Sequence, residues 1–299
     1  MLQDNPLNLN IKSLEPSSER LPLFIVGDVH GCAQELSELI TLAKNQIGAF
    51  QLILVGDLFT KGPDPVGVFE LIQEHKALCI KGNHDWALWS TLLHTQKRNP
   101  NTFPEHTKQT LYLIRYHKRA MFDLLSSLPH AYQSQVIPKL KRGDWENSFP
   151  LIVVHAGIDC TRGLTGTSER MMLTARYVRW EHKGNNKKLV IVPSAYRAEM
   201  LNNNKIITEN EKFRWHELHE GPELIVFGHD AKQGLFRKTL PSGRPICVGI
   251  DTGCTYGNSL TGYSPEFDLA LQVRAHRRYF DIKKNIILTR PSLSKLAAV

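Results

Sequence analysis

The sequence Leu23-Phe-Ile-Val-Gly-Asp-Val-His-Gly31 begins the stretch that decides the fold. The same pattern returns in Gln51-Leu-Ile-Leu-Val-Gly-Asp57 and in Ala77-Leu-Cys-Ile-Lys-Gly-Asn-His-Asp85. In each segment an apolar run typical of a buried strand leads to a glycine that permits a tight turn, and Asp, Asn or His side chains follow. Amphipathic stretches of helix length separate the runs, which predicts a parallel sheet in an α/β fold. Because ligand sites form where the carboxyl ends of such strands meet, the pattern also predicts a metal site.

Further elements follow from the periodicity of the apolar residues. We expect strands at 23–26, 51–55, 77–80, 151–154, 224–227, 246–250, 269–273 and 286–288, and helices over 33–44, 65–74, 111–125 and from Asp85 onward. Residues 96–100 and 142–147 are expected to be loops.

Two polar segments interrupt the alternation, at about 95–150 and 161–221. We expect the first to cover the site, with Arg115, Lys118 and Arg119 on the polar side of its helix. Those basic residues could hold an extended polyanion or could simply be solvated. Residues 1–20 are expected to form a flexible tail, and 21–299 a single catalytic domain that contains both insertions.

Composition narrows the class of protein. The chain has 299 residues, 41% hydrophobic and 22% charged, which is ordinary for a globular protein. No apolar run reaches the length of a membrane span, and the first twenty residues resemble no signal peptide. Five scattered cysteines favour core thiols in a reducing compartment, so we expect a cytoplasmic or otherwise intracellular protein. The net charge of +8 is consistent with an anionic substrate and equally with a solvated basic exterior.

Five polar segments, each after a β-rich run, together offer a set of metal ligands. His155-Ala-Gly157 and Gly228-His229 add imidazoles to the three segments above. One ion would be held by Asp28, His30 and Asp57, and a second by Asp57, Asn83, His155 and His229. Mixed oxygen and nitrogen ligands suit Zn, Mn or Fe better than Mg or Ca.

These segments, together with Gly56-Asp57 followed by Lys61-Gly62, resemble the calcineurin-like metallophosphoesterases of the phosphoprotein-phosphatase (PPP) superfamily, over roughly residues 23–262. The resemblance implies a central β-sandwich of two mixed sheets, flanked by helices and carrying helical cap insertions. It also implies two divalent metal ions (Mn, Zn, Fe or Co).

Three departures from the Ser/Thr protein phosphatases refine the resemblance. This chain has Thr60-Lys61 where they have Asp-Arg, Lys81 where they have Arg, and Asp85 where they have Glu. Lys61-Gly-Pro63 and Asp85 are similar instead to the ApaH-like phosphatases, relatives of bacterial diadenosine-tetraphosphate hydrolase. Members of that group include a fungal endopolyphosphatase and a kinetoplastid mRNA-decapping enzyme.

The resemblance implies hydrolysis of a phosphoanhydride bond by in-line attack of a metal-bridging hydroxide. Candidate substrates are inorganic polyphosphate, dinucleoside polyphosphates and the mRNA cap, with no membrane partner expected. His84 would be the general acid, although Thr60 replaces the Asp that orients this His in protein phosphatases. Asp85 would orient His84 or cap its helix. The residues expected to bind phosphate are Lys61, Asn83, Arg176 and Arg179.

Two other functions remain open at this point. A Ser/Thr protein phosphatase would hydrolyse phosphopeptides faster than polyphosphate, and the Thr60-Lys61 pair argues against it. A non-catalytic module that binds polyanions or RNA would keep the fold without bound transition metal, and the complete ligand set argues against it.

Overall fold

A computed structural model describes residues 9–14, 21–94, 105–113, 115–137, 149–183, 186–192 and 212–288. Its α-helices are α1 (Ala33–Ile47), α2 (Pro65–Glu74), α3 (Asn83–His94), α4 (Glu105–Leu113), α5 (Lys118–Ser127) and α6 (Glu169–Thr174). Its strands are β1 (Ile11–Ser13), β2 (Leu23–Val26), β3 (Gln51–Leu54), β4 (Leu78–Cys79), β5 (Ala131–Ile137), β6 (Phe149–Val154), β7 (Tyr177–Lys183), β8 (Asn186–Val192), β9 (Phe213–Arg214), β10 (Leu224–Phe227), β11 (Phe236–Thr239), β12 (Pro245–Gly249), β13 (Ser259–Ser264), β14 (Leu269–Arg274), β15 (Phe280–Asp281) and β16 (Ile286–Ile287).

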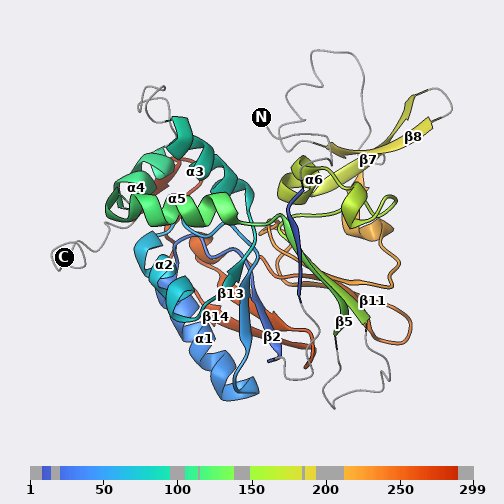
Figure 1. Cartoon of the computed structure of the whole chain (residues 1–299), viewed down its shortest axis with the longest axis horizontal. Helices are drawn as coiled ribbons and strands as arrows, with labels where there is room; N and C mark the ends of the chain where they lie inside the picture. Colours follow the sequence, from blue (N-terminus) through green and yellow to red (C-terminus); the bar gives the residue numbers. More distant parts are fainter. Residues whose placement is uncertain are drawn as a thin grey trace.

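Two mixed sheets form the centre of the molecule (Figure 1). The five-stranded sheet has the order β14-β13-β2-β3-β4, and its β2, β3 and β4 are parallel, as the sequence predicts. The six-stranded sheet has the order β1-β5-β6-β10-β12-β11, with β6, β10 and β12 parallel. Both sheets therefore direct the carboxyl ends of parallel strands toward polar loops.

An apolar layer lies between the two sheets. It is formed by buried side chains such as Ile25 and Ile53 from one sheet and Val153, Val226 and Val248 from the other. Helices α1 and α2 cover the opposite face of the five-stranded sheet (Figure 1). Full burial of an aliphatic side chain contributes about 1.5–3 kcal/mol, so these layers fix the strand ends in place.

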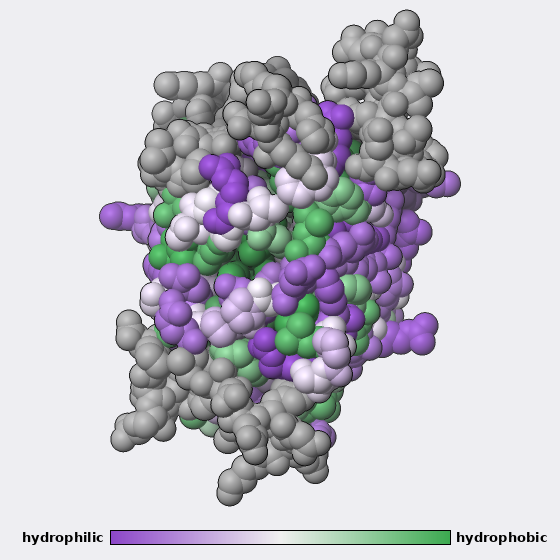
Figure 2. Space-filling view, turned by 90° about the vertical axis from the view of Figure 1, so that its right-hand side faces the viewer, coloured by the Kyte–Doolittle hydropathy of each residue, from purple (hydrophilic) through white to green (hydrophobic). Residues whose placement is uncertain are grey.

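The second insertion adds a small three-stranded sheet, β8-β7-β9, on the outer side of the six-stranded sheet. Figure 2 shows the face turned to the right in Figure 1, where hydrophobic residues gather in patches separated by hydrophilic ones. Further along the chain, the last two described strands, β15 and β16, form a hairpin that contacts α4. Within the described ranges, no helix combines the length and hydropathy needed to cross a bilayer.

Some local predictions were wrong. Part of the expected tail, Ile11–Ser13, is strand β1, because its backbone pairs in parallel with β5. The helix expected over 111–125 is divided by a 3-10 turn at Arg115–His117 into α4 and α5. The division follows from packing, since α4 contacts α2 and β16 whereas α5 contacts α3. The loops expected at 96–100 and 142–147 lie outside the described residues.

Candidate metal centre

All six expected ligands lie at the ends of strands and face one another. Asp28 and His30 follow β2, Asp57 follows β3, Asn83 begins α3 after β4, His155 follows β6 and His229 follows β10. Asp57 occupies the middle, because its two carboxylate oxygens serve two different groups of side chains.

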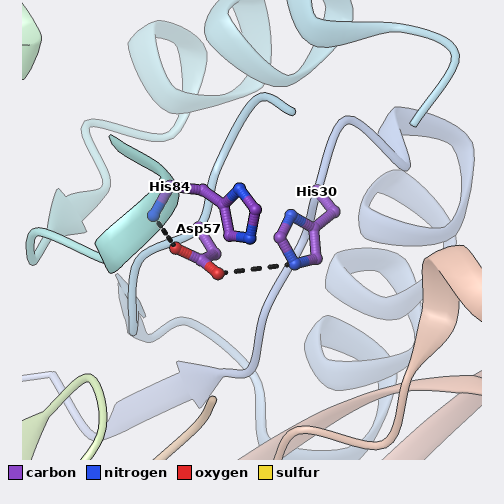
Figure 3. Close-up of side chains that lie close together, drawn as sticks. All are labelled: His30, Asp57 and His84. Atoms are coloured by element: carbon purple, nitrogen blue, oxygen red, sulfur yellow. Dashed lines mark hydrogen bonds and ion pairs between the residues drawn. The ribbon is translucent and has the colours of Figure 1, made fainter. Parts of the chain in front are cut away.

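The first group surrounds the Oδ2 atom of Asp57. His30 Nε2 lies 3.4 Å from this oxygen and 4.0 Å from Asp28 Oδ2. His84 completes the group, because one ligand atom from each of His30, Asp57 and His84 lies within 4.8 Å of the other two. Figure 3 shows the imidazoles of His30 and His84 close to the Asp57 carboxylate, whose Oδ1 accepts a hydrogen bond from the His84 backbone amide at 2.8 Å.

The second group surrounds the Oδ1 atom of Asp57. His155 Nε2 lies 3.6 Å from this oxygen and 3.0 Å from Asn83 Oδ1. His155 Nδ1 is 2.9 Å from the carbonyl oxygen of Val55, which can only accept, so Nδ1 carries the proton and Nε2 carries a lone pair. Three acceptor atoms thus face one another, an arrangement that a shared cation would stabilise.

His229 adds a fourth acceptor to the second group. Its Nε2 is buried and has no hydrogen-bond partner among the described residues. Its ring lies edge-on to that of His155, with the centroids 5.0 Å apart. A buried imidazole nitrogen without a partner costs about 1–3 kcal/mol, and coordination to a cation would remove that cost. The donor set therefore fits two transition-metal ions that share Asp57.

Burial shapes the protonation of the centre. It raises the pKa of Asp57 to about 6 and raises the pKa of Asp28 well above its usual value, with Asp251 and Asp57 adding repulsion at Asp28. Burial also lowers the pKa of His155 to about 4 and lowers the pKa of His30 well below its usual value. The imidazoles are therefore neutral at pH 7 and can offer lone pairs to a metal.

Backbone strain is concentrated at this centre. His30, Asp57, Lys61 and His229 have φ values of 48°, 53°, 73° and 68°, in the left-handed region that non-glycine residues rarely adopt. Each such residue costs about 1–3 kcal/mol and persists only where its surroundings hold it. The strain turns the side chains inward at the strand ends.

Two glycines leave space for the ligands. A Cβ atom at Gly82 would lie 2.2 Å from Asp57 Oδ1, and one at Gly228 would lie 2.1 Å from Asp28 Oδ1. Both contacts are far shorter than any side chain allows. Positions 82 and 228 therefore require glycine, because a side chain at either position would collide with a carboxylate that follows a neighbouring strand.

Asp85 contacts backbone amides. Its Oδ2 accepts from Asp57 N at 2.7 Å and from Gly82 N at 3.0 Å, and its Oδ1 accepts from Leu58 N at 2.9 Å. The bond to Gly82, the residue before α3, is a helix cap, so the capping interpretation is favoured over the orientation of His84. Burial, followed by repulsion from Asp57, raises the pKa of Asp85 to about 7.

The His84 ring lies among other rings. Its centroid is 5.1 Å from that of His30 and 5.7 Å from that of His106, a residue of α4. Thr60 does not take the place of an orienting Asp here, because its hydroxyl lies 3.5 Å from Nδ1 of His30. His106 is in turn held by Asn285, whose Oδ1 is 3.0 Å from His106 Nδ1.

Two of the expected phosphate ligands flank the centre. Lys61 Nζ lies 3.2 Å from His30 Nε2, beside the first group. Arg176 donates to the carbonyl oxygen of His229 at 2.7 Å, beside the second group, and its Nε lies 3.5 Å from Asp230 Oδ1. Arg179 is placed differently, because its Nη2 lies 3.5 Å from Oε1 of Glu181 on the same strand.

Sequence reasoning missed three neighbours of the centre. Asp251 follows β12 and is buried, and burial, followed by repulsion from Asp57, raises its pKa to about 6. The strand-end pattern that identified the other ligands could have found it. Tyr256 and His106 had no comparable signal, since one lies in a turn and the other in an insertion helix.

The chain is similar in sequence and in fold to known proteins. The family model described as calcineurin-like phosphoesterase matches residues 21–233. An asymmetrical bis(5'-nucleosyl)-tetraphosphatase of Oceanobacillus iheyensis is 26% identical over 81% of this chain and 88% of its own length. A symmetrical bis(5'-nucleosyl)-tetraphosphatase of Actinobacillus pleuropneumoniae is 28% identical over 80% of this chain and 93% of its own. A crystal structure of a candidate diadenosine tetraphosphatase has the same fold, with a TM-score of 0.64, 24% identity and coverage of 90% of this chain and 99% of the other.

Proposed function

The chain belongs to the calcineurin-like phosphoesterase family, a family of metal-dependent hydrolases, and on that basis we propose that it cleaves phosphoanhydride bonds in anionic substrates. We place dinucleoside polyphosphates first among these substrates, because relatives that align over most of the chain are named for that activity. Inorganic polyphosphate and capped RNA carry the same bond and are the next candidates.

The observation that carries this proposal is the presence of cationic side chains on both flanks of Asp57. Lys61 lies beside His30 in the first group, and Arg176 lies beside His229 in the second. A phosphomonoester carries negative charge only on the phosphoryl group, whereas a phosphoanhydride chain carries it on both sides of the bond that is cut. Positive charge on both sides of Asp57 therefore favours a phosphoanhydride substrate over a phosphomonoester.

In this proposal each residue has a separate role. The centre would hold two cations through Asp28, His30 and Asp57 and through Asp57, Asn83, His155 and His229. When bound, these ions lower the pKa of a water molecule toward about 7 and offset the charge of the phosphoryl oxygens.

The remaining roles fall to groups around the ligands. Lys61, Asn83 and Arg176 would orient the phosphates, with Arg179 as a more distant contact. His84, the member of the first group that is not assigned as a metal ligand, would hold a proton near the leaving oxygen. A polyphosphate leaving group needs little protonation, which fits the lack of a carboxylate bonded to the His84 ring within the described residues. Asp85 would act through the backbone, as a positioning residue.

The test is one assay of four substrates with Mn²⁺: diadenosine tetraphosphate, polyphosphate, capped RNA and a phosphopeptide panel. We expect the anhydrides to be hydrolysed faster than the phosphopeptides, and the rate to fall roughly 100-fold or more in Asp57→Asn. Unchanged turnover in that variant would exclude the two-cation centre. Faster hydrolysis of phosphopeptides would instead indicate a Ser/Thr protein phosphatase.

A further inference from the structure

The ammonium group of Lys61 has two polar partners. Its Nζ lies 3.2 Å from His30 Nε2 and 3.1 Å from the hydroxyl of Tyr256. It also lies 5.6 Å from the centroid of the Tyr256 ring and 6.0 Å from that of Phe280. The lysine is only 8% exposed, so these contacts define its surroundings.

The contact with His30 uses a lone pair that a metal would also need. An ammonium group can only donate, so His30 Nε2 accepts, and Nδ1 carries the ring proton toward Thr60 Oγ1 at 3.5 Å. The same Nε2 faces the carboxylate oxygens of Asp57 and Asp28 at 3.4 and 4.0 Å. A cation held by these three ligands would take the lone pair and would repel the ammonium group.

The backbone of Lys61 cannot move away to relieve this conflict. A Cβ atom at Gly62 would lie 1.9 Å from the carbonyl oxygen of His30, so the two turns are in direct contact. The amide of Asp64 also donates to the carbonyl oxygen of Gly31 at 3.0 Å. Only the lysine side chain is free to change partner.

Tyr256 is the polar contact that Lys61 would keep after its side chain leaves His30. It ends the 3-10 turn Cys254–Tyr256, which is anchored where Asp251 Oδ1 accepts from Gly253 N at 3.0 Å. Its hydroxyl and the faces of two aromatic rings stabilise a cation that has left His30. The Tyr256 hydroxyl accepts from Lys61, because an ammonium group can only donate.

We propose that Tyr256 is a positioning residue that keeps Lys61 at the phosphate side of the centre once a cation binds His30. This inference rests on the proposed function, because it requires a bound cation and an anionic substrate. It makes the binding of the first cation and the presentation of Lys61 to phosphate a single coupled event.

The test is a double-mutant cycle on Mn²⁺ affinity, measured by calorimetry with the full chain after chelator treatment. Lys61→Met removes the competitor for His30, and we expect roughly tenfold tighter Mn²⁺ binding. Tyr256→Phe keeps the ring but removes the hydroxyl, so Lys61 leaves His30 less readily and Mn²⁺ binding weakens roughly fivefold. In the double variant we expect the affinity of Lys61→Met alone, because Tyr256 acts through Lys61.

Arg176→Met is the matched control for charge, since Arg176 contacts a carbonyl oxygen and does not occupy a ligand lone pair. We expect Tyr256→Phe to weaken Mn²⁺ binding in this background as it does in the wild type. Inorganic phosphate, titrated at saturating Mn²⁺, should bind more weakly to Tyr256→Phe than to the wild type. Thermal unfolding of each variant establishes that it is folded.

The outcomes separate the two proposals. A Tyr256→Phe effect of equal size with and without Lys61, or a Lys61→Met variant that binds Mn²⁺ no tighter than the wild type, overturns this inference and leaves the proposed function intact. A wild-type chain that binds no Mn²⁺ overturns both.

Discussion

Asp85 fixes the backbone of Asp57 from a position 28 residues further along the chain. Its Oδ2 accepts from the Asp57 amide at 2.7 Å, while the Asp57 side chain faces the two ligand groups. The carboxylate shared by both groups is therefore held in place by a second, buried carboxylate that contacts the backbone.

Asp85→Ala should weaken both the fold and the metal centre. The change removes the acceptor for three backbone amides, and we expect a loss of roughly 2–4 kcal/mol in the free energy of unfolding. Displacement of Asp57 should weaken Mn²⁺ binding roughly 10–100-fold. Urea denaturation and calorimetry measure the two effects. Asp85→Asn keeps one acceptor oxygen, so its stability and its Mn²⁺ affinity should lie between those of the wild type and those of Asp85→Ala. Wild-type Mn²⁺ affinity in Asp85→Ala would contradict the positioning role.

Metal binding should release protons below neutral pH. The pKa values of Asp57 and Asp251 are raised to about 6 and that of Asp28 is raised well above its usual value, so these carboxyls hold protons at pH 5.5 that a bound cation would displace into the buffer. His155, with its pKa lowered to about 4, contributes none. Calorimetry in two buffers of different ionisation enthalpy should show proton release at pH 5.5 and little at pH 8. Equal heats in both buffers at pH 5.5 would count against this assignment.

Arg176 and Arg179 should differ in their effect on substrate binding. Arg176 is oriented toward the centre by His229 and Asp230, whereas Arg179 pairs with Glu181. We expect Arg176→Ala to raise KM for diadenosine tetraphosphate roughly tenfold. The effect of Arg179→Ala should be smaller. Steady-state kinetics on both variants test this order. Equal or reversed effects on KM would contradict the assignment of Arg176 as the phosphate contact beside the second group.

His216 should make stability depend on pH, away from the metal centre. It is buried against Phe227 and Phe236, and burial lowers its pKa to about 4. The unfolded chain takes up the proton first as pH falls, so stability is fully present above pH 6.5 and is lost between 6.5 and 4. The loss is at most about 3 kcal/mol.

His216→Phe keeps an aromatic ring and cannot titrate, so its urea denaturation midpoint should fall less on acidification. The bond between His216 and Gln233 is lost in this variant, which lowers its stability at pH 7. The informative quantity is therefore the difference between the two pH profiles. Parallel profiles from pH 7 to 4 would mean that folding does not lower the pKa of His216.

The strand-end pattern predicted the parallel strands β2, β3 and β4 because each is a continuous apolar run. Strand β13 was missed although it lies beside β2 in the same sheet. In its sequence, Ser259-Leu-Thr-Gly-Tyr-Ser264, polar side chains find partners elsewhere in the fold: the Thr261 hydroxyl lies 2.6 Å from that of Thr252 and accepts from Gln272 of β14 at 2.9 Å. Polar groups satisfied by tertiary partners leave no periodic signal.

The same limit applies to the candidate centre. The six expected ligands and Asp251 all follow apolar strands, so one rule places them together. His106 and Tyr256 come close to the centre only because α4 and the turn after β12 pack there. The spacing of residues in the sequence does not predict that packing.

The space that Gly82 and Gly228 leave for neighbouring carboxylates has a consequence for judging other chains of this kind. An alanine at position 82 would add a single methyl group and alter no ligand. Its collision with Asp57 would nevertheless push apart the two halves of the centre. Relatives should therefore be screened for inactive members by the small residues between their ligands as well as by the ligands themselves.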